Sequence, residues 1–370
     1  METKIMTTEI AIIGGGPAGL AASIEAARSG AQVTLIDENN QPGGQLFKQI
    51  HKFFGSRAHY AGIRGFDIGM QLLQECEELK VKTLLNTVAF GLFERNEIGL
   101  VFNDKSFILK AKKIILATGA SENVLTFPGW TLPGVMGAGA LQTMMNVHRV
   151  LPGKNILMIG SGNVGLIVSY QALQAGANVV AIIEAAPKIG GYGVHAAKIR
   201  RAGVPILTSY TVKEVLGDNQ VRAAIITQVG KQWEPIKGTE KDLDIDTICL
   251  SVGLSPLAEL AWMAGCRFVY IHDLGGFIPI HNCDMRTNLE NIYVAGDITG
   301  IEEASTALEE GRLAGLSAAE SLGYIKSDVC VQRKKELQNR LCDLRSGPFG
   351  ELRKKLKDPL MKRKELIDYV

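Results

Sequence analysis

Residues 10–29 constrain the fold of this chain more than any other stretch. An apolar run is followed at once by Gly14-x-Gly16-x-x-Gly19 and then by a helix-like segment. This order predicts a strand, a tight turn and a helix start. The first glycine permits the turn, the second lets a pyrophosphate approach the backbone, and the third lets the helix pack close to the strand. The phosphate would lie on the amide groups and positive dipole of the helix N-terminus.

An acidic pair, Asp37-Glu38, follows the next apolar run, residues 32–36. Asp37 comes 18 residues after Gly19, close to the spacing of about 20 expected for the acid that binds a ribose 2′-hydroxyl. The strand, turn, helix and acid together predict a dinucleotide or adenine-nucleotide site, and the alternative is an ordinary tight strand–helix turn. The Pro-Gly-Gly-Gln segment, residues 42–45, predicts a second loop against the cofactor, with a plain surface turn as the alternative.

The opening pattern recurs in residues 155–184. A strand-like run leads into Gly160-x-Gly162-x-x-Gly165, a helix-like segment follows, and a second apolar run ends in Glu184. The two loops begin 146 residues apart, and the acid that accompanies each of them argues against a chance match. No arginine adjoins Glu184, so a 2′-phosphate would meet a negative charge there. The second site is therefore expected to prefer NAD(H) over NADP(H).

The remaining segments predict that the chain leaves its first sheet and later returns to it. Two Pro-Gly pairs in residues 127–135 indicate an irregular crossing into a second domain, and the run 246–256 indicates the return. A later strand ends in Gly296-Asp297, at the edge where such sheets bind ligands. The other predicted strands are 81–86, 98–102, 107–109, the run from 113 that ends in the glycine turn near 119, and 291–295. The other predicted helices are 66–79 and 304–321.

Charge and hydropathy restrict the classes of partner. The formal net charge of +2 does not indicate nucleic acid, and no apolar run approaches the roughly 20 residues of a membrane span. Residues 1–8 lack the apolar core of a signal peptide, so a cytoplasmic location is expected. The tail, residues 326–370, holds 13 Lys/Arg against 7 Asp/Glu and is helix-permissive with a break near 346–348. It is either a solvated basic face or a docking arm for an acidic partner subunit.

The six cysteines give no sign of a metal or redox centre. No two of them form a C-x-x-C pair, and their spacings fit neither a zinc site nor an iron–sulfur cluster held by this chain alone. We therefore expect no metal site and interpret the cysteines as small buried hydrophobic residues.

The ordered set of motifs resembles a known family. The two glycine loops, Pro42-Gly43-Gly44-Gln45, Ala117-Thr118-Gly119 and Ala295-Gly296-Asp297, in this order, are similar to the two-dinucleotide-domain flavoproteins, the pyridine nucleotide-disulfide oxidoreductases and their relatives. The resemblance covers residues 8–325. Residues 128–142 are similar to the nucleotide-binding subunit of opine oxidases, hydrogen cyanide synthase, dye-linked proline dehydrogenases and heterotetrameric sarcosine oxidase.

The resemblance implies an α/β fold of two Rossmann-like, three-layer ββα domains, with the NAD(H) domain inserted in the FAD domain. The implied FAD domain is 1–120 with 250–325, the implied NAD(H) domain is 121–249, and the basic tail follows. The implied NAD(H) contacts are Gly160, Gly162, Asn163, Val164, Gly165 and Glu184. The other implied cofactor contacts are Gly14, Gly16, Pro17, Ala18, Gly19, Asp37 or else Glu38, Gly43, Gly44, Gln45, Lys48, Val88 on the third strand, Ala117, Thr118, Gly119, Gly253, Gly296, Asp297, Glu303 and Ala304.

The function implied is a flavoprotein oxidoreductase subunit that passes hydride between NAD(H) and FAD, with an amine, amino acid or hydroxy acid oxidised in a partner subunit. The missing C-x-x-C excludes disulfide reduction, and hydride transfer requires no side chain as acid or base, so no catalytic residue is predicted. Two alternatives stay open: a stand-alone NADH:acceptor reductase that delivers electrons to a ferredoxin, quinone or oxygen, and a non-redox subunit whose sites hold ATP or NAD.

Overall fold

The computed structural model describes residues 5–362. The chain divides into two compact units: unit 1 contains the described residues of 1–121 and 255–370, and unit 2 contains residues 122–254. Unit 2 is therefore inserted in unit 1, as the predicted fold class requires. The described part of the basic tail belongs to unit 1.

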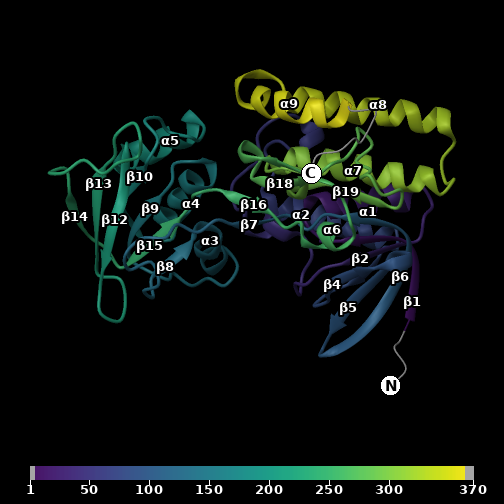
Figure 1. The fold of residues 1–370 in the computed structure, drawn as a ribbon, viewed down its shortest axis with the longest axis horizontal. Coiled ribbons are helices and arrows are strands. Elements are labelled where there is room, and N and C mark those ends of the chain that lie inside the picture. The colour runs from purple at the N-terminus through teal and green to yellow at the C-terminus, as the bar shows by residue number, and fades with distance from the viewer. Residues whose placement is uncertain (1–4, 363–370) are drawn as a thin grey trace. The chain divides into compact units, whose positions relative to one another are not determined.

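Unit 1 is built on a mixed sheet flanked by helices (Figure 1). Its strands are β1 (Ile5–Ile13), β2 (Val33–Ile36), β3 (Lys82–Leu84), β4 (Val88–Phe93), β5 (Glu97–Phe102), β6 (Lys105–Leu116), β17 (Phe268–Ile271), β18 (Gly276–Pro279) and β19 (Ile292–Val294). Its α-helices are α1 (Pro17–Arg28), α2 (Gly65–Glu78), α6 (Glu259–Met263), α7 (Ala304–Ser321), α8 (Ser327–Leu344) and α9 (Gly347–Lys362). Its 3₁₀ turns are η1 (Gly44–Lys48), η2 (Arg57–His59), η3 (Glu94–Asn96), η4 (His272–Leu274) and η5 (Gly296–Thr299).

The long strand β6 joins the two halves of this sheet. Its last residues pair in parallel with β1 on one side and β19 on the other, while residues 105–110 pair antiparallel with β5, which pairs in turn with β4. The sequence predicted two separate strands, 107–109 and the run that begins at 113, and the prediction that they are separate was wrong. Lysines interrupt the apolar pattern between them, but no Gly or Pro is present to end the strand.

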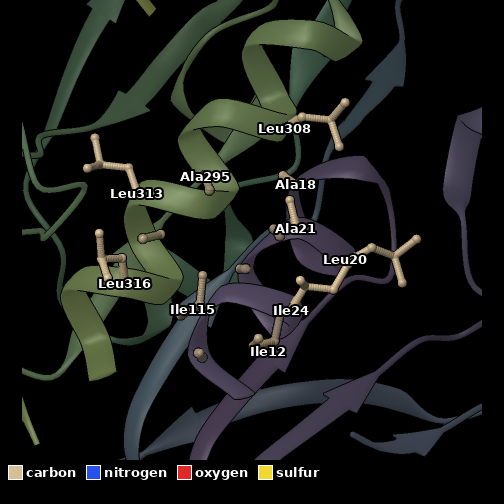
Figure 2. Close-up of a cluster of buried hydrophobic side chains, with 14 of the residues drawn as sticks. Ile12, Ala18, Leu20, Ala21, Ile24, Ile115, Ala295, Leu308, Leu313 and Leu316 are labelled. Carbon is tan, nitrogen blue, oxygen red and sulfur yellow. The ribbon is translucent and has the colours of Figure 1, made fainter. Parts of the chain in front are cut away.

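The alternation of side chains along β1 explains the three layers of unit 1. Ile10 and Ile12 point to the core shared with α1, α2 and α7, and Ala11 and Ile13 point to the core shared with the β4–β5 meander and α6. Figure 2 shows the first of these cores, with Ile12 and Ile115 of the sheet below the side chains of α1 and α7. The parallel part of the sheet is thus covered by helices on one face, and the antiparallel β4–β5 part of the sheet packs with α6 against the other face.

Helices α1 and α7 approach each other closely because small residues line their contact. A Cβ atom added to Gly311 would lie 2.1 Å from the Ala18 carbonyl oxygen, and one added to Gly315 would lie 2.3 Å from that of Ala22. Figure 2 shows Ala18 and Ala21 of α1 facing α7. This contact fixes the N-terminal halves of both helices beside the ends of β1 and β19.

Unit 2 repeats the same plan in a smaller form. Its strands are β8 (Val135–Gly137), β9 (Asn155–Ile159), β10 (Asn178–Glu184), β11 (Ile206–Thr208), β12 (Tyr210–Leu216), β13 (Ala223–Gln228), β14 (Lys241–Asp244) and β15 (Thr247–Leu250), and its helices are α3 (Ala138–Asn146), α4 (Asn163–Gln174) and α5 (Gly193–Arg201). The order β11-β10-β9-β15-β8 is entirely parallel, and β12-β13-β14 form an antiparallel sheet. Two short strands, β7 (Ala120–Glu122) and β16 (Leu254–Pro256), pair where the chain enters and leaves this unit.

The tail forms the helices α8 and α9. Helix α8 ends at Leu344 and α9 begins at Gly347, so the break between them lies close to the predicted one. Cys330, Leu337 and Leu341 of α8 are buried in the same hydrophobic core as the apolar side chains of α7. Both helices lie along α7 in Figure 1. Part of this basic segment is therefore packed into unit 1 and is not a fully solvated face.

Candidate functional site

The loop after β1 has the geometry that a phosphate-binding turn requires. Gly14 has φ +101°, and a Cβ there would lie 2.2 Å from the Ala117 carbonyl oxygen. A Cβ on Gly19 would lie 1.8 Å from the Gly14 carbonyl oxygen, so α1 packs directly on the turn. By contrast, an added Cβ on Gly16 meets no atom within 4 Å. Gly16 therefore borders open space, as a residue beside a ligand must.

The N-terminus of α1 faces this space without a protein cap. Gly16 is the N-cap residue and has no side-chain hydrogen bond, and Pro17 occupies the first turn. The free amides and the positive end of the helix dipole fit a phosphate. Ala18 is buried against α7, so its side chain serves packing, while its backbone belongs to the turn.

The buried carboxylate of Asp37 holds this loop in shape. Its Oδ2 accepts a hydrogen bond from the Gly15 amide at 2.6 Å, and its Oδ1 accepts one from the Asn39 amide at 2.8 Å. Oδ1 also accepts a hydrogen bond from Asn39 Nδ2 at 2.9 Å, so Oδ2 keeps the second lone pair with which the carboxylate can accept a ribose hydroxyl. The neighbouring Glu38 is exposed.

The second glycine pair lies directly on the first loop. The Gly43 amide donates to the Gly15 carbonyl oxygen at 2.6 Å, and a Cβ on Gly44 would lie 3.0 Å from the Gly16 Cα. Both glycines have positive φ. The pair begins η1, which carries an exposed Gln45 and a partly buried Lys48. These contacts place residues 43–48 beside the open space at Gly16.

One predicted position differs in its secondary structure. Val88 was predicted on the third strand, but that strand, β3, ends at Leu84, and Val88 begins β4 instead. Asn86 has positive φ and breaks the strand between them. The Thr87 amide donates to the Asp37 carbonyl oxygen at 3.0 Å, so this backbone still runs beside the acid.

The segment that returns from unit 2 completes the edge of the unit 1 sheet. The Ala295 amide donates to the Leu116 carbonyl oxygen at 3.0 Å, and a Cβ on Gly296 would lie 2.9 Å from the Ala18 Cβ. Burial raises the pKa of Asp297 to about 6. Glu303 is the N-cap residue of α7, which starts at Ala304, but its side chain makes no capping hydrogen bond.

The end of β6 lies on the same edge. The Ala117 amide donates to the Ile13 carbonyl oxygen at 2.8 Å, and the Thr118 hydroxyl donates to the Leu257 carbonyl oxygen. Gly119 has φ +76°, and a Cβ there would meet no atom within 4 Å. The structure therefore brings the backbone of residues 14–19, 43–44, 117–118 and 295–296 together at one sheet edge.

Unit 2 carries the same loop geometry. Gly160 has φ +103°, with an added Cβ 2.0 Å from the Ser251 carbonyl oxygen, and a Cβ on Gly165 would lie 2.3 Å from the Gly160 carbonyl oxygen. A Cβ on Gly162 would again meet nothing within 4 Å, and Gly162 caps α4 without a side-chain hydrogen bond. Val164 in the first turn of α4 is exposed.

Glu184 takes the role in unit 2 that Asp37 takes in unit 1. Its Oε2 accepts hydrogen bonds from the Ser161 amide at 2.9 Å and the Ser161 hydroxyl at 2.7 Å, and its Oε1 accepts one from the Ala186 amide at 3.0 Å. In both units the acid therefore binds the residue that follows the first glycine of the loop. Gly253, predicted as a contact, has φ +111° beyond the end of β15.

Sequence reasoning missed a second glycine pair in unit 2, Gly190-Gly191. The Gly191 amide donates to the Ser161 carbonyl oxygen at 2.8 Å, as Gly43 does to Gly15, and a Cβ on Gly191 would lie 2.9 Å from the Gly162 carbonyl carbon. A signal was present, because the pair follows Glu184 at the same spacing at which Gly43-Gly44 follows Asp37. The Asn163 side chain accepts from the Tyr192 amide and ties this second loop to α4.

The described residues contain no disulfide and no cluster of candidate metal ligands. Within residues 5–362, no group of three or more His, Cys, Asp or Glu side chains could hold a metal ion, and no disulfide joins the six cysteines. Four cysteines are buried as expected, but Cys283 and Cys342 are exposed, so the prediction of burial was wrong for these two. No helix among the described residues is both long and apolar enough to cross a membrane.

Each unit therefore fits a dinucleotide at its glycine loop, since open space, an uncapped helix N-terminus and a loop-bound acid coincide there. Two such units in one chain define a class of two-domain nucleotide-binding α/β enzymes. The chain belongs to the pyridine nucleotide-disulphide oxidoreductase family, whose model matches residues 8–311. It is an oxidoreductase that uses FAD and a pyridine nucleotide.

The chain is also similar to individual proteins of known name or structure. The chain is 29% identical over 342 residues to an opine oxidase subunit of Agrobacterium tumefaciens (strain Ach5), covering 87% of this chain and 67% of that protein. It is 25% identical over 358 residues to hydrogen cyanide synthase subunit HcnB of Pseudomonas protegens, covering 92% and 76%. The thioredoxin reductase of Lactococcus lactis has the same fold, with a TM-score of 0.70, 23% identity, and coverage of 86% of this chain and 100% of that one.

Proposed function

We propose that unit 1 binds FAD, that unit 2 binds NAD(H), and that the chain passes hydride equivalents between them as one subunit of a larger oxidoreductase. The observation that carries this proposal is the repeated loop geometry: in both units the second glycine borders open space in front of an uncapped helix. When bound, the two cofactors supply the hydride chemistry. The chain supplies binding and orientation.

Three features support FAD in unit 1. The loop at Gly16 is accompanied by Gly296-Asp297 and by the N-terminus of α7, which belong to the same unit. A flavin dinucleotide carries a ribityl chain and a ring beyond its pyrophosphate, so it requires contacts of this kind. The dipole of α7 would stabilise the flavin edge that becomes negative on reduction.

The acid of unit 2 supports NAD(H) rather than NADP(H). Glu184 is held by three hydrogen bonds at the end of β10, and neither neighbour in sequence is basic. A 2′-phosphate at this position would meet a negative charge held by the loop, whereas a 2′-hydroxyl could donate to it.

The relatives support a role within a complex. The matched proteins in Agrobacterium and Pseudomonas are named as subunits, of opine oxidase and of hydrogen cyanide synthase. This chain spans about two thirds of the length of the opine oxidase protein. We therefore place the oxidation of an amine, amino acid or hydroxy acid in a partner subunit, and the electron path through the flavin and nicotinamide in this one.

Two measurements on the purified full chain test the proposal. Denaturation should release FAD, identified by absorbance and mass, and release of ATP without any flavin would overturn the assignment of unit 1. Steady-state oxidation of NADH with a simple acceptor should be slow without the partner subunit. Sustained turnover by the chain alone would favour a stand-alone reductase instead.

A further inference from the structure

A buried ionic cluster joins the C-terminal helices to the loop that carries Asp297. Lys357 of α9 is fully buried, and Arg345 at the end of α8 is 3% exposed. Their partners are two buried carboxylates, Glu302 in the loop before α7 and Glu310 on α7. Nothing in the composition of this basic tail predicted that two of its cations would be buried in the fold.

Lys357 uses all three of its ammonium protons in this cluster. Its Nζ donates to Glu310 Oε1 at 2.8 Å, to Thr299 Oγ1 at 2.9 Å and to Glu302 Oε2 at 3.0 Å. Arg345 Nε lies 3.0 Å from Glu302 Oε1, and its guanidinium also binds Glu310. A single tail lysine thus connects a turn, a loop and a helix that are distant from it in sequence.

The same carboxylates hold the backbone next to Asp297. Glu310 Oε2 accepts a hydrogen bond from the Gly296 amide at 2.9 Å and lies 2.8 Å from Thr299 Oγ1. The Glu302 amide lies 3.4 Å from Asp297 Oδ1. The η5 turn, Gly296–Thr299, is therefore held from inside the fold by residues that the tail neutralises.

The charges of the tail keep these carboxylates ionised. Burial opposes ionisation of Glu310, but the neighbouring charges of Lys357 and Arg345 outweigh it and lower its pKa to about 2. Without them, two carboxylates would be left in the interior with no compensating charge, which a folded protein relieves by protonation or by opening to water. Either response would disturb the hydrogen bond to the Gly296 amide.

We propose that α8 and α9 form a clasp on the flavin-binding turn, with Lys357 and Arg345 as positioning residues that fix Gly296 and Asp297 through Glu302 and Glu310. This inference rests on the proposed placement of FAD in unit 1. The clasp orders the ribityl-binding backbone before FAD arrives, so the tail lowers the entropic cost of binding the cofactor. The tail residues act through the turn.

The test compares Lys357→Met with Lys355→Met in the full chain. Lys355 lies two residues away on the same helix, where it is exposed and pairs with the exposed Glu351. Lys357→Met should raise the Kd for FAD by about tenfold or more, equivalent to about 1.4 kcal/mol, and should speed amide hydrogen exchange in residues 295–303 of the FAD-free protein. Lys355→Met should change neither quantity, and both variants should bind NADH as the wild type does.

A milder variant serves if Lys357→Met does not fold. Thr299→Val keeps the shape of the side chain but removes the hydroxyl through which Lys357 reaches the turn, together with the bonds of that hydroxyl to the Gly296 carbonyl oxygen and Glu310. It should therefore weaken FAD binding and loosen the same segment to a smaller extent. The clasp is refuted if a folded Lys357→Met protein, or Thr299→Val in its absence, keeps wild-type FAD affinity and exchange. If the wild type itself binds no FAD, the proposed function fails, and exchange in residues 295–303 still decides whether the tail holds the turn.

Discussion

The glycine loops allow a matched pair of substitutions that separates binding from folding. Gly16 and Gly162 have φ of −72° and −65°, which any residue adopts, and an added Cβ at either position meets no atom within 4 Å. Gly16→Ala should therefore leave the FAD-free protein nearly as stable as the wild type. Alanine is a poorer N-cap residue than glycine, which destabilises the folded protein, but it lowers the entropy of the unfolded chain, which stabilises it. Each effect is worth about 0.5–1 kcal/mol, so the two nearly cancel.

Binding should respond much more strongly than stability. The new methyl group would occupy the space that the pyrophosphate must enter, so at least one charge-assisted hydrogen bond to the loop would be lost, at about 1.5–3 kcal/mol. Gly16→Ala should accordingly weaken FAD binding by about ten- to a hundredfold and leave NADH binding unchanged. Gly162→Ala should show the reverse pattern.

Fluorescence titration of FAD and NADH and thermal melting of the nucleotide-free protein measure these effects. Gly14→Ala is the control for misfolding, because φ +101° and a Cβ 2.2 Å from the Ala117 carbonyl oxygen should lower its melting temperature outright. The reasoning fails if folded Gly16→Ala binds FAD as the wild type does, or if it melts as early as Gly14→Ala.

Three further predictions concern packing, pH and cofactor preference. Gly311→Val should destabilise the protein by about 3 kcal/mol, seen as a lower melting temperature, because its Cβ would lie 2.1 Å from the Ala18 carbonyl oxygen. Burial lowers the pKa of His281 from 6.5 to about 4. Its neutral form therefore contributes about 3 kcal/mol of stability above pH 6.5, and this contribution is lost progressively as the pH falls from 6.5 to 4. In denaturant titrations, His281→Gln should show a smaller loss of stability over this pH range. Glu184→Ser should raise KM for NADH and narrow the preference for NADH over NADPH.

Each of these predictions has a contradicting result. A Gly311→Val protein that melts with the wild type would mean that α1 and α7 can separate at no cost. If the free energy of unfolding of His281→Gln still falls between pH 6.5 and 4 as in the wild type, other groups cause that loss of stability. An unchanged ratio of NADH to NADPH activity in Glu184→Ser would remove Glu184 from the choice of pyridine nucleotide.

The sequence predicted the parts of the site that depend on local order. The strand, turn and helix of each loop and the acid after it lie within about 30 residues, residues 10–37 and 155–184, and the residue spacing alone determines how they meet. The same local logic would have found Gly190-Gly191, since it repeats the spacing of Gly43-Gly44 after its acid. The helix 304–321 was predicted with its observed bounds because its pattern is long and uninterrupted.

The remaining features depend on contacts between distant segments. The burial of Lys357 is decided by Glu302 and Glu310, more than 40 residues earlier, and nothing in a basic helix distinguishes it from the exposed Lys355. The continuity of β6 depends on β1 and β5 as partners on its two sides. The sequence predicted that the side chain of Asp37 binds a ribose, but its hydrogen bond from the Gly15 amide is visible only in three dimensions.

The most direct test of the whole account is anaerobic titration of the FAD-loaded full chain with NADH, followed by the visible absorbance of the flavin. The account predicts that NADH bleaches the flavin, that NADPH does so less effectively, and that Gly162→Ala requires more NADH for the same bleaching. A protein that cannot be loaded with FAD, or whose bound flavin neither pyridine nucleotide reduces, would contradict the assignment of the two glycine loops to one path of electron transfer.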